Sequence, residues 1–116
     1  MVAKRRLDLM ERELHVGGTY FTLFYADERH TLPVVETFVY IGPVQRDPDG
    51  AVEHMFQFAR SYHQGGDWNQ MTMSQRNEYT EPPVVTFDAS GLDAVVDVAG
   101  LIEALAPLRQ RRHGDA

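Results

Sequence analysis

The chain has 116 residues, of which 43% are hydrophobic and 24% are charged, a composition typical of one soluble globular domain and too short for two. Leu, Ile, Val and Phe together make up one quarter of the sequence, which excludes a disordered body. No apolar run approaches the length of a membrane span, and cysteine is absent, which excludes disulfides and thiolate metal sites. We therefore expect a single cytoplasmic domain over residues 1–116, with no membrane partner and no secretory leader.

The charges are unevenly distributed along this domain. The net charge is −6, but residues 13–108 contain 14 acidic side chains and only four basic ones, and the other basic residues gather at the two ends. An acidic body repels phosphate backbones, which argues against nucleic acid as a partner. The same charge predicts good solubility or, more specifically, a basic protein as partner. The basic ends, 1–6 and 109–116, are predicted to be flexible.

The first half of the chain predicts one short helix and three strands. Residues 4–14 carry apolar side chains at helical spacing and precede two glycines, which indicates a short N-terminal helix. Residues 19–25 are aromatic or β-branched and apolar on both faces, as in a central strand. The segments 34–41 and 54–62 flank an Asp-Gly turn signal and are predicted to form an antiparallel hairpin.

The second half begins with a polar segment, residues 64–81, which contains scattered large apolar residues. Irregular segments of this length are rare in compact domains, and two alternating methionines predict a short strand over 70–76. A second short strand is predicted over 84–87, where β-branched residues follow two prolines.

A C-terminal helix is predicted over 92–108. Ser90 and Asp93 have the spacing of a capping box at its start. The stripe expected to dock on the sheet consists of Val95, Ala99, Ile102 and Leu105. Asp97 and Gly100 mark a point at which this helix can break.

The order of these elements predicts an α+β fold. Runs of strands followed by a separate helix are typical of an antiparallel sheet. Because the strands are short and the first is apolar on both faces, we expect four or five strands in a strongly curled sheet or a small open barrel.

Candidate catalytic residues are few. The sequence contains no metal-binding, nucleophile or phosphate-loop motif, so we expect no metal and no cofactor. Glu36 is the best acid–base candidate, because it shares a strand face with apolar residues whose burial would raise its pKa. Arg60 and His54 lie on the next predicted strand and are candidates to complete such a site. The alternative is that Glu36 is solvated or pairs with Arg60 across the hairpin.

Candidate binding residues lie around the polar segment: Trp68, His63, Asp67 and Tyr79. Trp and Tyr are favoured at interfaces because they combine a large rigid apolar surface with a polar tip. Trp68 lies between two glycines and two polar amides, where no strand face is available to bury it. We expect the ring either to contact a partner or to plug the end of the sheet.

These observations lead to two functional hypotheses. The first is a non-catalytic protein-binding module, for example an inhibitor or immunity-type protein directed against a basic protein. The alternative is a small enzyme or small-ligand-binding domain with its site at Glu36, Arg60 and His54. An exposed apolar patch favours the first hypothesis, and a deep pocket favours the second.

Overall fold

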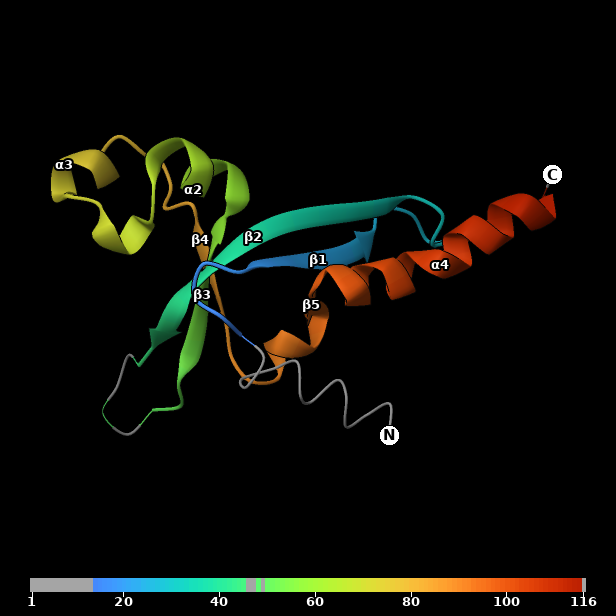
Figure 1. The fold of residues 1–116 in the computed structure, drawn as a ribbon, viewed down its shortest axis with the longest axis horizontal. Coiled ribbons are helices and arrows are strands. Elements are labelled where there is room, and N and C mark those ends of the chain that lie inside the picture. Colours follow the sequence, from blue (N-terminus) through green and yellow to red (C-terminus); the bar gives the residue numbers. More distant parts are fainter. Residues whose placement is uncertain (1–13, 46–47, 49, 116) are drawn as a thin grey trace.

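The computed structural model describes residues 14–45, 48 and 50–115, and these form an α+β fold with an antiparallel sheet (Figure 1). The strands are β1 (Thr19–Tyr25), β2 (Pro33–Val44), β3 (Glu53–Phe58), β4 (Val84–Phe87) and β5 (Val95–Val96). The helices are α2 (Ala59–Gly65), η1 (Trp68–Gln70), α3 (Met73–Arg76), η2 (Gly91–Ala94) and α4 (Val98–Asp115). The sheet order is β4-β3-β2-β1-β5, with β4 and β5 as its two edges. The predicted fold class is therefore confirmed, and the sheet does not close into a barrel.

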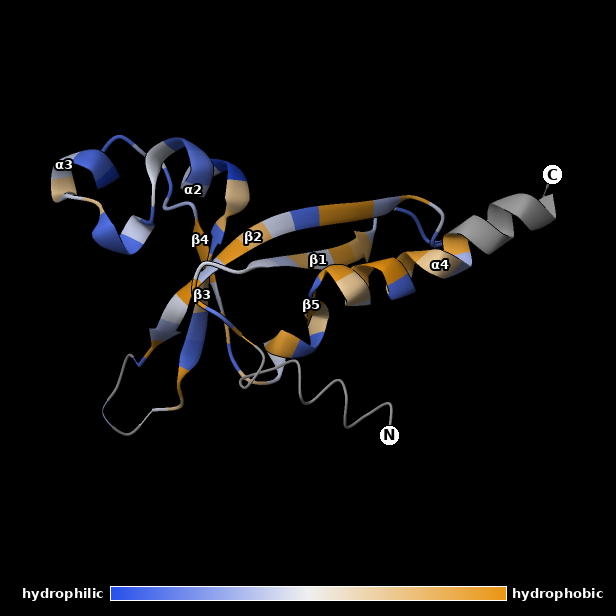
Figure 2. Ribbon diagram, viewed as in Figure 1, coloured by the Kyte–Doolittle hydropathy of each residue, from blue (hydrophilic) through white to orange (hydrophobic). Residues whose placement is uncertain are grey.

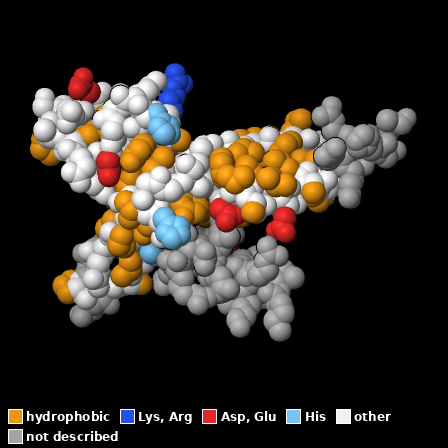
Figure 3. All heavy atoms as spheres, in the orientation of Figure 1, with side chains coloured by type: hydrophobic (Ala, Val, Ile, Leu, Met, Phe, Trp, Pro, Cys, Tyr) orange, Lys and Arg blue, Asp and Glu red, His pale blue; other side chains and the backbone are white. Residues whose placement is uncertain are grey.

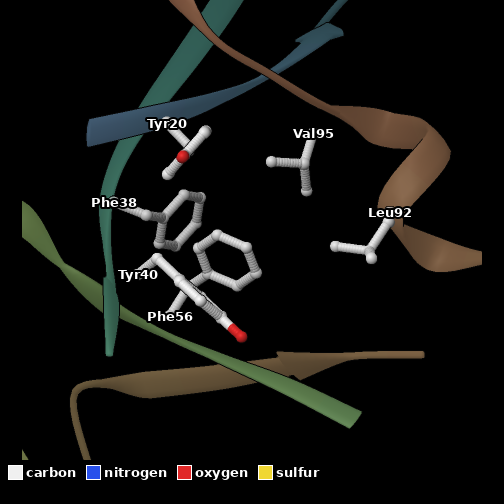
Figure 4. Packing of buried hydrophobic residues seen from close by; sticks show 6 residues of the cluster. All are labelled: Tyr20, Phe38, Tyr40, Phe56, Leu92 and Val95. Carbon is white, nitrogen blue, oxygen red and sulfur yellow. The ribbon is translucent and has the colours of Figure 1, made fainter. Parts of the chain in front are cut away.

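One face of the sheet carries an aromatic core (Figure 4). Its buried members are Tyr20, Phe38, Tyr40, Phe56, Leu92 and Val95. The strand register pairs Tyr20 with Phe38 and Tyr40 with Phe56, which places these four rings on the same face. The fully buried Phe56 ring meets Tyr20 edge-on, with centroids 6.0 Å apart and an interplanar angle of 84°. Such edge contacts stabilise aromatic cores beyond the area that they bury.

The opposite face is also covered where β2 and β3 run together. Val39, Ile41 and Gln57 are buried there, and residues 59–79, which include α2, η1 and α3, are hydrogen-bonded to this region. The middle of the sheet is therefore buried on both faces. The aromatic core covers one face, and residues 59–79 are held on the other by polar contacts.

The predicted strand over 54–62 is partly wrong, and the predicted strand over 70–76 is wrong. β3 ends at Phe58, and α2 follows because the next residues favour a helix, which Gly66 ends with a φ of 87°. Instead of a strand, residues 70–76 form the end of η1 and the short helix α3. The side chains of Thr72 and Gln75 cap each other's backbone amides there, and this capping box outweighs the alternation of the methionines.

The predicted helix over 92–108 is correct only in its second half. Val95–Val96 pairs with β1 as the strand β5, as expected for β-branched residues beside a sheet edge. Asp88, and not Ser90, caps the preceding turn, since its Oδ1 accepts the Gly91 amide at 2.7 Å. The predicted short N-terminal helix lies almost entirely outside the described residues.

Helix α4 packs beside β1 (Figure 1). It starts where Asp97 accepts the amide of Gly100 at 2.8 Å, at the point where the sequence predicts that the helix can break. A Cβ on Gly100 would lie 2.9 Å from the Cβ of Val96, and glycine therefore permits this close approach. The helix faces the sheet with the half-buried Leu101, Ala104, Leu105 and Leu108, whereas Ala99 and Ile102 of the predicted stripe are exposed. Its backbone stays helical to Asp115.

The molecule is elongated, because one end of the sheet extends beyond the core. Its Cα radius of gyration is 16.4 Å, against about 13 Å for a compact domain of this length. Figure 1 shows that the β1–β2 hairpin and α4 run side by side away from β3, β4 and the short helices. The hairpin and α4 are therefore in contact with solvent over a larger fraction of their surface than the strands around the core are.

Candidate protein-interaction surfaces

The amide of Gln57 anchors the polar segment to the sheet. Gln57 lies in β3 and is fully buried. Its Nε2 donates to Ser61 Oγ at 2.9 Å and to the carbonyl of Gly66 at 3.0 Å, and its Oε1 accepts the amide of Trp68 at 2.8 Å. Because a buried amide is costly unless its donors and acceptor are paired, these bonds fix α2 and η1 on the sheet.

The Trp68 ring is half-buried within this segment. The Arg76 guanidinium carbon lies 4.7 Å from the ring centroid, and Arg76 also donates two hydrogen bonds to the Trp68 carbonyl, at 3.2 and 2.9 Å. Tyr79 meets the ring edge-on, with centroids 5.6 Å apart. One face of the indole is therefore already in contact with a cation of the same chain.

Asp67 is the N-cap of η1. Its Oδ1 accepts the amide of Asn69 at 2.9 Å, as expected for Asp at this position. The Asn69 side chain then donates to the carbonyl of Ile41 in β2 at 3.1 Å. Asp67 thus orients the residue that ties η1 to the sheet.

The structure therefore brings only part of the predicted binding group together. Trp68 and Tyr79 are in contact, and Asp67 caps the helix in which Trp68 lies. His63 is exposed in the last turn of α2, where its ring meets that of Tyr62 edge-on.

His54, one of the three candidate catalytic residues, belongs to the core. It is buried, and its Nδ1 lies 2.8 Å from Tyr40 Oη. The two rings also contact each other, with centroids 5.7 Å apart. This arrangement is that of a histidine packed against aromatic neighbours, away from the surface.

Glu36 lies far from His54, and Arg60 lies in α2 beyond the end of β3. In the β2–β3 register His54 is paired with Pro43, seven positions along β2 from Glu36, which is roughly 20 Å in an extended strand. Pairing of Glu36 with Arg60 requires β3 to continue beyond Phe58, where α2 begins instead. The three residues do not form one site.

The surfaces of the β1–β2 hairpin and of α4 are rich in exposed apolar side chains. We call five of them the hairpin–helix surface: Phe24, Leu32, Val35, Val98 and Ile102, which are 39% to 64% exposed. Figure 2 shows hydrophobic residues along both elements, and in Figure 3 such side chains gather over the hairpin. Phe24 is paired with Val34 and Leu23 with Val35, so Phe24 and Val35 point to opposite faces of the ribbon. The hairpin is therefore apolar on both sides.

The loop between β1 and β2 has a fixed shape. The Asp27 carboxylate accepts the amides of Thr31 and Leu32 at 2.9 and 2.8 Å, together with the Thr31 hydroxyl. These hydrogen bonds, that of the Thr31 hydroxyl above all, lower the pKa of Asp27. His30 has a φ of 56°, and its ring stacks on Tyr25 with centroids 4.8 Å apart. Leu32 is thus presented by an ordered turn.

The charged residues on the elements of the hairpin–helix surface are mostly acidic. In β1, the following loop, β2 and the first turns of α4, the acidic residues are Asp27, Glu28, Glu36, Asp97 and Glu103, and Arg29 is the only basic one. Both faces of the hairpin and the exposed side of α4 therefore carry apolar side chains, and the charges on the same elements are mostly negative.

No family model, curated protein or solved structure matches this chain. Among the described residues, no three His, Asp or Glu side chains are close enough together to hold a metal ion. None of the helices in the described part of the chain is long and apolar enough to cross a membrane.

The sequence analysis missed the hairpin–helix surface for two reasons. The apolar faces of 19–25 indicate a strand covered on both sides, but β5 pairs with only two of its residues. On the helix, Val98 and Ile102 are four residues apart and lie beside the half-buried stripe. The available signal was that the apolar arc of this helix is wider than one sheet contact requires.

Proposed function

We propose that this protein is a non-catalytic protein-binding module that docks a basic protein on its hairpin–helix surface. The supporting observation is the concentration of five exposed large apolar side chains on two neighbouring elements. Exposed apolar clusters rimmed by polar residues are typical of protein–protein interfaces. The acidic residues on the same elements favour a basic partner and accelerate its arrival.

The residues 63–79 are a second candidate surface for the same function. Because Arg76 and Tyr79 already contact the Trp68 ring, a partner would meet mainly the exposed His63 and Met73 there. Met73 is 70% exposed. The two surfaces lie at opposite ends of the sheet (Figure 1), so variants can separate them.

The test is capture of proteins from native lysate on the immobilised chain, measured by quantitative mass spectrometry. The double variant Phe24→Ser, Ile102→Ser removes two exposed apolar side chains and should leave stability within about 1 kcal/mol. We expect it to lose a basic protein that the unmodified chain captures. Met73→Ser is the control, because it makes an exposed apolar side chain polar at the other end of the sheet, and it should retain that protein.

Two results contradict this proposal. If the double variant captures the same proteins as the unmodified chain, the hairpin–helix surface is not the binding site. If Trp68→Ala alone abolishes capture while the double variant does not, binding occurs at residues 63–79 instead.

A further inference from the structure

The edge of β2 at residues 33–36 has hydrogen-bonding groups that point away from β1. The amide of Tyr40 donates to the carbonyl of Gly18 at 3.0 Å, so Tyr40 directs its backbone groups toward the β1 side. Backbone direction alternates along a strand paired in this way. Glu36 therefore also faces β1, and Val35 directs its N–H and C=O to the opposite side.

On that opposite side β3 has already ended. The last residue pair between the two strands is Phe38 with Phe58, and α2 begins at the next residue. Among the described residues, no strand pairs with β2 beyond this point, and Figure 1 shows no neighbouring ribbon along the upper edge of β2 toward the loop. Such an edge is a template for pairing with another chain.

We propose that this edge receives an extended segment of the basic partner, which adds to the sheet as a sixth strand beside β2. The inference rests on the proposed function and specifies how that function is carried out. Added strands bind by main-chain hydrogen bonds, and the side chains on alternate faces give specificity. Val35 supplies a donor and an acceptor, and Pro33 supplies a carbonyl on the same side.

The side chains along the edge define what the added strand must carry. Val34 and Glu36 share one face with Phe24, and the exposed Val35 occupies the other. An incoming Lys or Arg opposite Glu36 gains a cross-strand ion pair, and an apolar residue fits beside Val35. The required segment is therefore extended and alternates basic with apolar residues, consistent with an acidic body that attracts cations.

The charge at this edge also argues against a second copy of the chain as the occupant. Antiparallel pairing of two such edges brings the Glu36 side chains of both copies close together. Like charges at neighbouring cross-strand positions are destabilising.

The outer edge of β4 provides an internal comparison. The amide of Phe58 donates to the carbonyl of Pro83 at 3.0 Å, so by alternation Thr86 directs its backbone groups away from the sheet. Two prolines precede β4 and no acidic residue lies in it. This edge has open backbone groups without the charge, which makes it the matched control.

The experiment is an NMR titration of the ¹⁵N-labelled chain of 116 residues with a defined probe at low salt. The probe is the blocked heptapeptide Thr-Val-Lys-Val-Lys-Val-Thr, and its control has Glu in place of both Lys residues. We expect the lysine peptide to shift the amide resonance of Val35 and to slow its hydrogen exchange, and we expect the glutamate peptide to do neither.

Variants on both sides of the contact test the strand geometry. Val35→Pro removes an amide that points away from β1, a substitution that edge strands tolerate, and should weaken peptide binding about tenfold. Glu36→Gln should weaken it about two- to fivefold, and Thr86→Pro should leave it unchanged. If Val35→Pro does not fold, N-methylation of the peptide gives the same information. Methylating the amides that face β2 should abolish binding, and methylating the alternate amides should not.

Several results would overturn the added-strand proposal. One is a set of amide resonance shifts centred on β4 or on residues 63–79. The others are equal binding of the lysine and glutamate peptides, and no binding at millimolar peptide concentration. A dimer of the free chain that Val35→Pro dissociates would assign the edge to a second copy. None of these results affects the lysate experiment. If the Phe24→Ser, Ile102→Ser variant loses capture but the peptide does not bind at β2, the proposed function stands and only the added-strand mechanism is rejected.

Discussion

At the scale of single residues, Gln57 determines how the polar segment meets the sheet. The sequence around Trp68 gives no apolar partner for the indole, which suggests either a partner protein or a plug. The structure shows a third arrangement, in which the backbone amide of Trp68 is bound by Gln57 and its ring is contacted by Arg76. This could not be predicted, because the strand pattern does not indicate that a polar residue at position 57 is fully buried.

Replacement of Gln57 by Leu should destabilise the protein by about 2–4 kcal/mol. Leu keeps most of the side-chain volume but leaves the Trp68 amide and the Gly66 carbonyl without their partner, and each buried unpaired group costs about 1–3 kcal/mol. Urea unfolding followed by circular dichroism measures the change. Gln64→Leu, an exposed position on α2, is the control and should change stability by less than about 0.5 kcal/mol. A similar small change for Gln57→Leu would show that the amide is not the anchor.

Acidification should loosen the β1–β2 loop before the sheet unfolds. The pKa of Asp27 is lowered from 3.8, chiefly by the Thr31 hydroxyl, so its ionised form is favoured in the folded state. That contribution is present at neutral pH and is lost as the pH falls through the lowered pKa. The protection of the amides of Thr31 and Leu32 against hydrogen exchange should therefore fall selectively below about pH 4. Asp27→Ala, which has no side-chain acceptor, should leave these amides weakly protected at every pH, and unchanged protection below pH 3 would contradict the assignment.

At the scale of elements, local patterns identified the strands better than their ends. The segments 19–25 and 84–87 are strands with the predicted bounds, because their residues favour extended backbone and turn signals flank them. The strand at Val95–Val96 was hidden within a helical pattern, since apolar spacing cannot distinguish two residues that pair with β1 from the start of a helix. This short strand determines which side of α4 contacts the sheet. The side chains that face the sheet therefore differ from the predicted stripe.

Substitution of Gly100 by Ala should destabilise the protein although alanine favours helices. The higher helix propensity of Ala is worth about 1 kcal/mol, but the added Cβ would lie 2.9 Å from the Cβ of Val96. Forcing a methyl group into such a contact typically costs about 1–3 kcal/mol. Thermal unfolding should show a net loss for Gly100→Ala that is smaller in a Val96→Gly background, because glycine lacks the Cβ that the added methyl group would meet. A stabilised single variant would mean that α4 does not approach β5 so closely.

Truncation of Ile102 to Ala should change stability by less than about 0.5 kcal/mol, because surface substitutions have small effects. Ile102 is 64% exposed, whereas the sequence pattern places it in the docking stripe and predicts the loss of about 2–5 kcal/mol of a core truncation. The half-buried Leu105 is the matched comparison on the same helix. Urea unfolding that gives a larger loss for Ile102→Ala than for Leu105→Ala would contradict the observed orientation of α4.

At the scale of the whole molecule, composition predicted an acidic domain, but not where its apolar surface lies. The antiparallel sheet follows from the order of strand and helix patterns. The separation of Glu36 from His54 does not, since it depends on where β3 ends and α2 begins. The elongated shape likewise results from β5 having only two residues, which leaves the far end of the hairpin with α4 as its main neighbour. Both features depend on where strands end and on how they pair, which local periodicity does not encode.

The charge of the whole body should control how fast the partner associates. Residues 13–108 carry 14 acidic and four basic side chains, so a basic protein is attracted over about one Debye length, which shrinks from about 30 Å at 0.01 M salt to about 3 Å at 1 M. In stopped-flow measurements with the captured partner, the association rate constant should fall steeply as salt is raised, while the dissociation rate constant changes little. The apolar contacts act in the bound state, so Phe24→Ser should accelerate dissociation and leave the salt dependence of association unchanged. Association that is insensitive to salt would remove charge attraction from the mechanism, and the hairpin–helix surface would then bind through its apolar side chains alone.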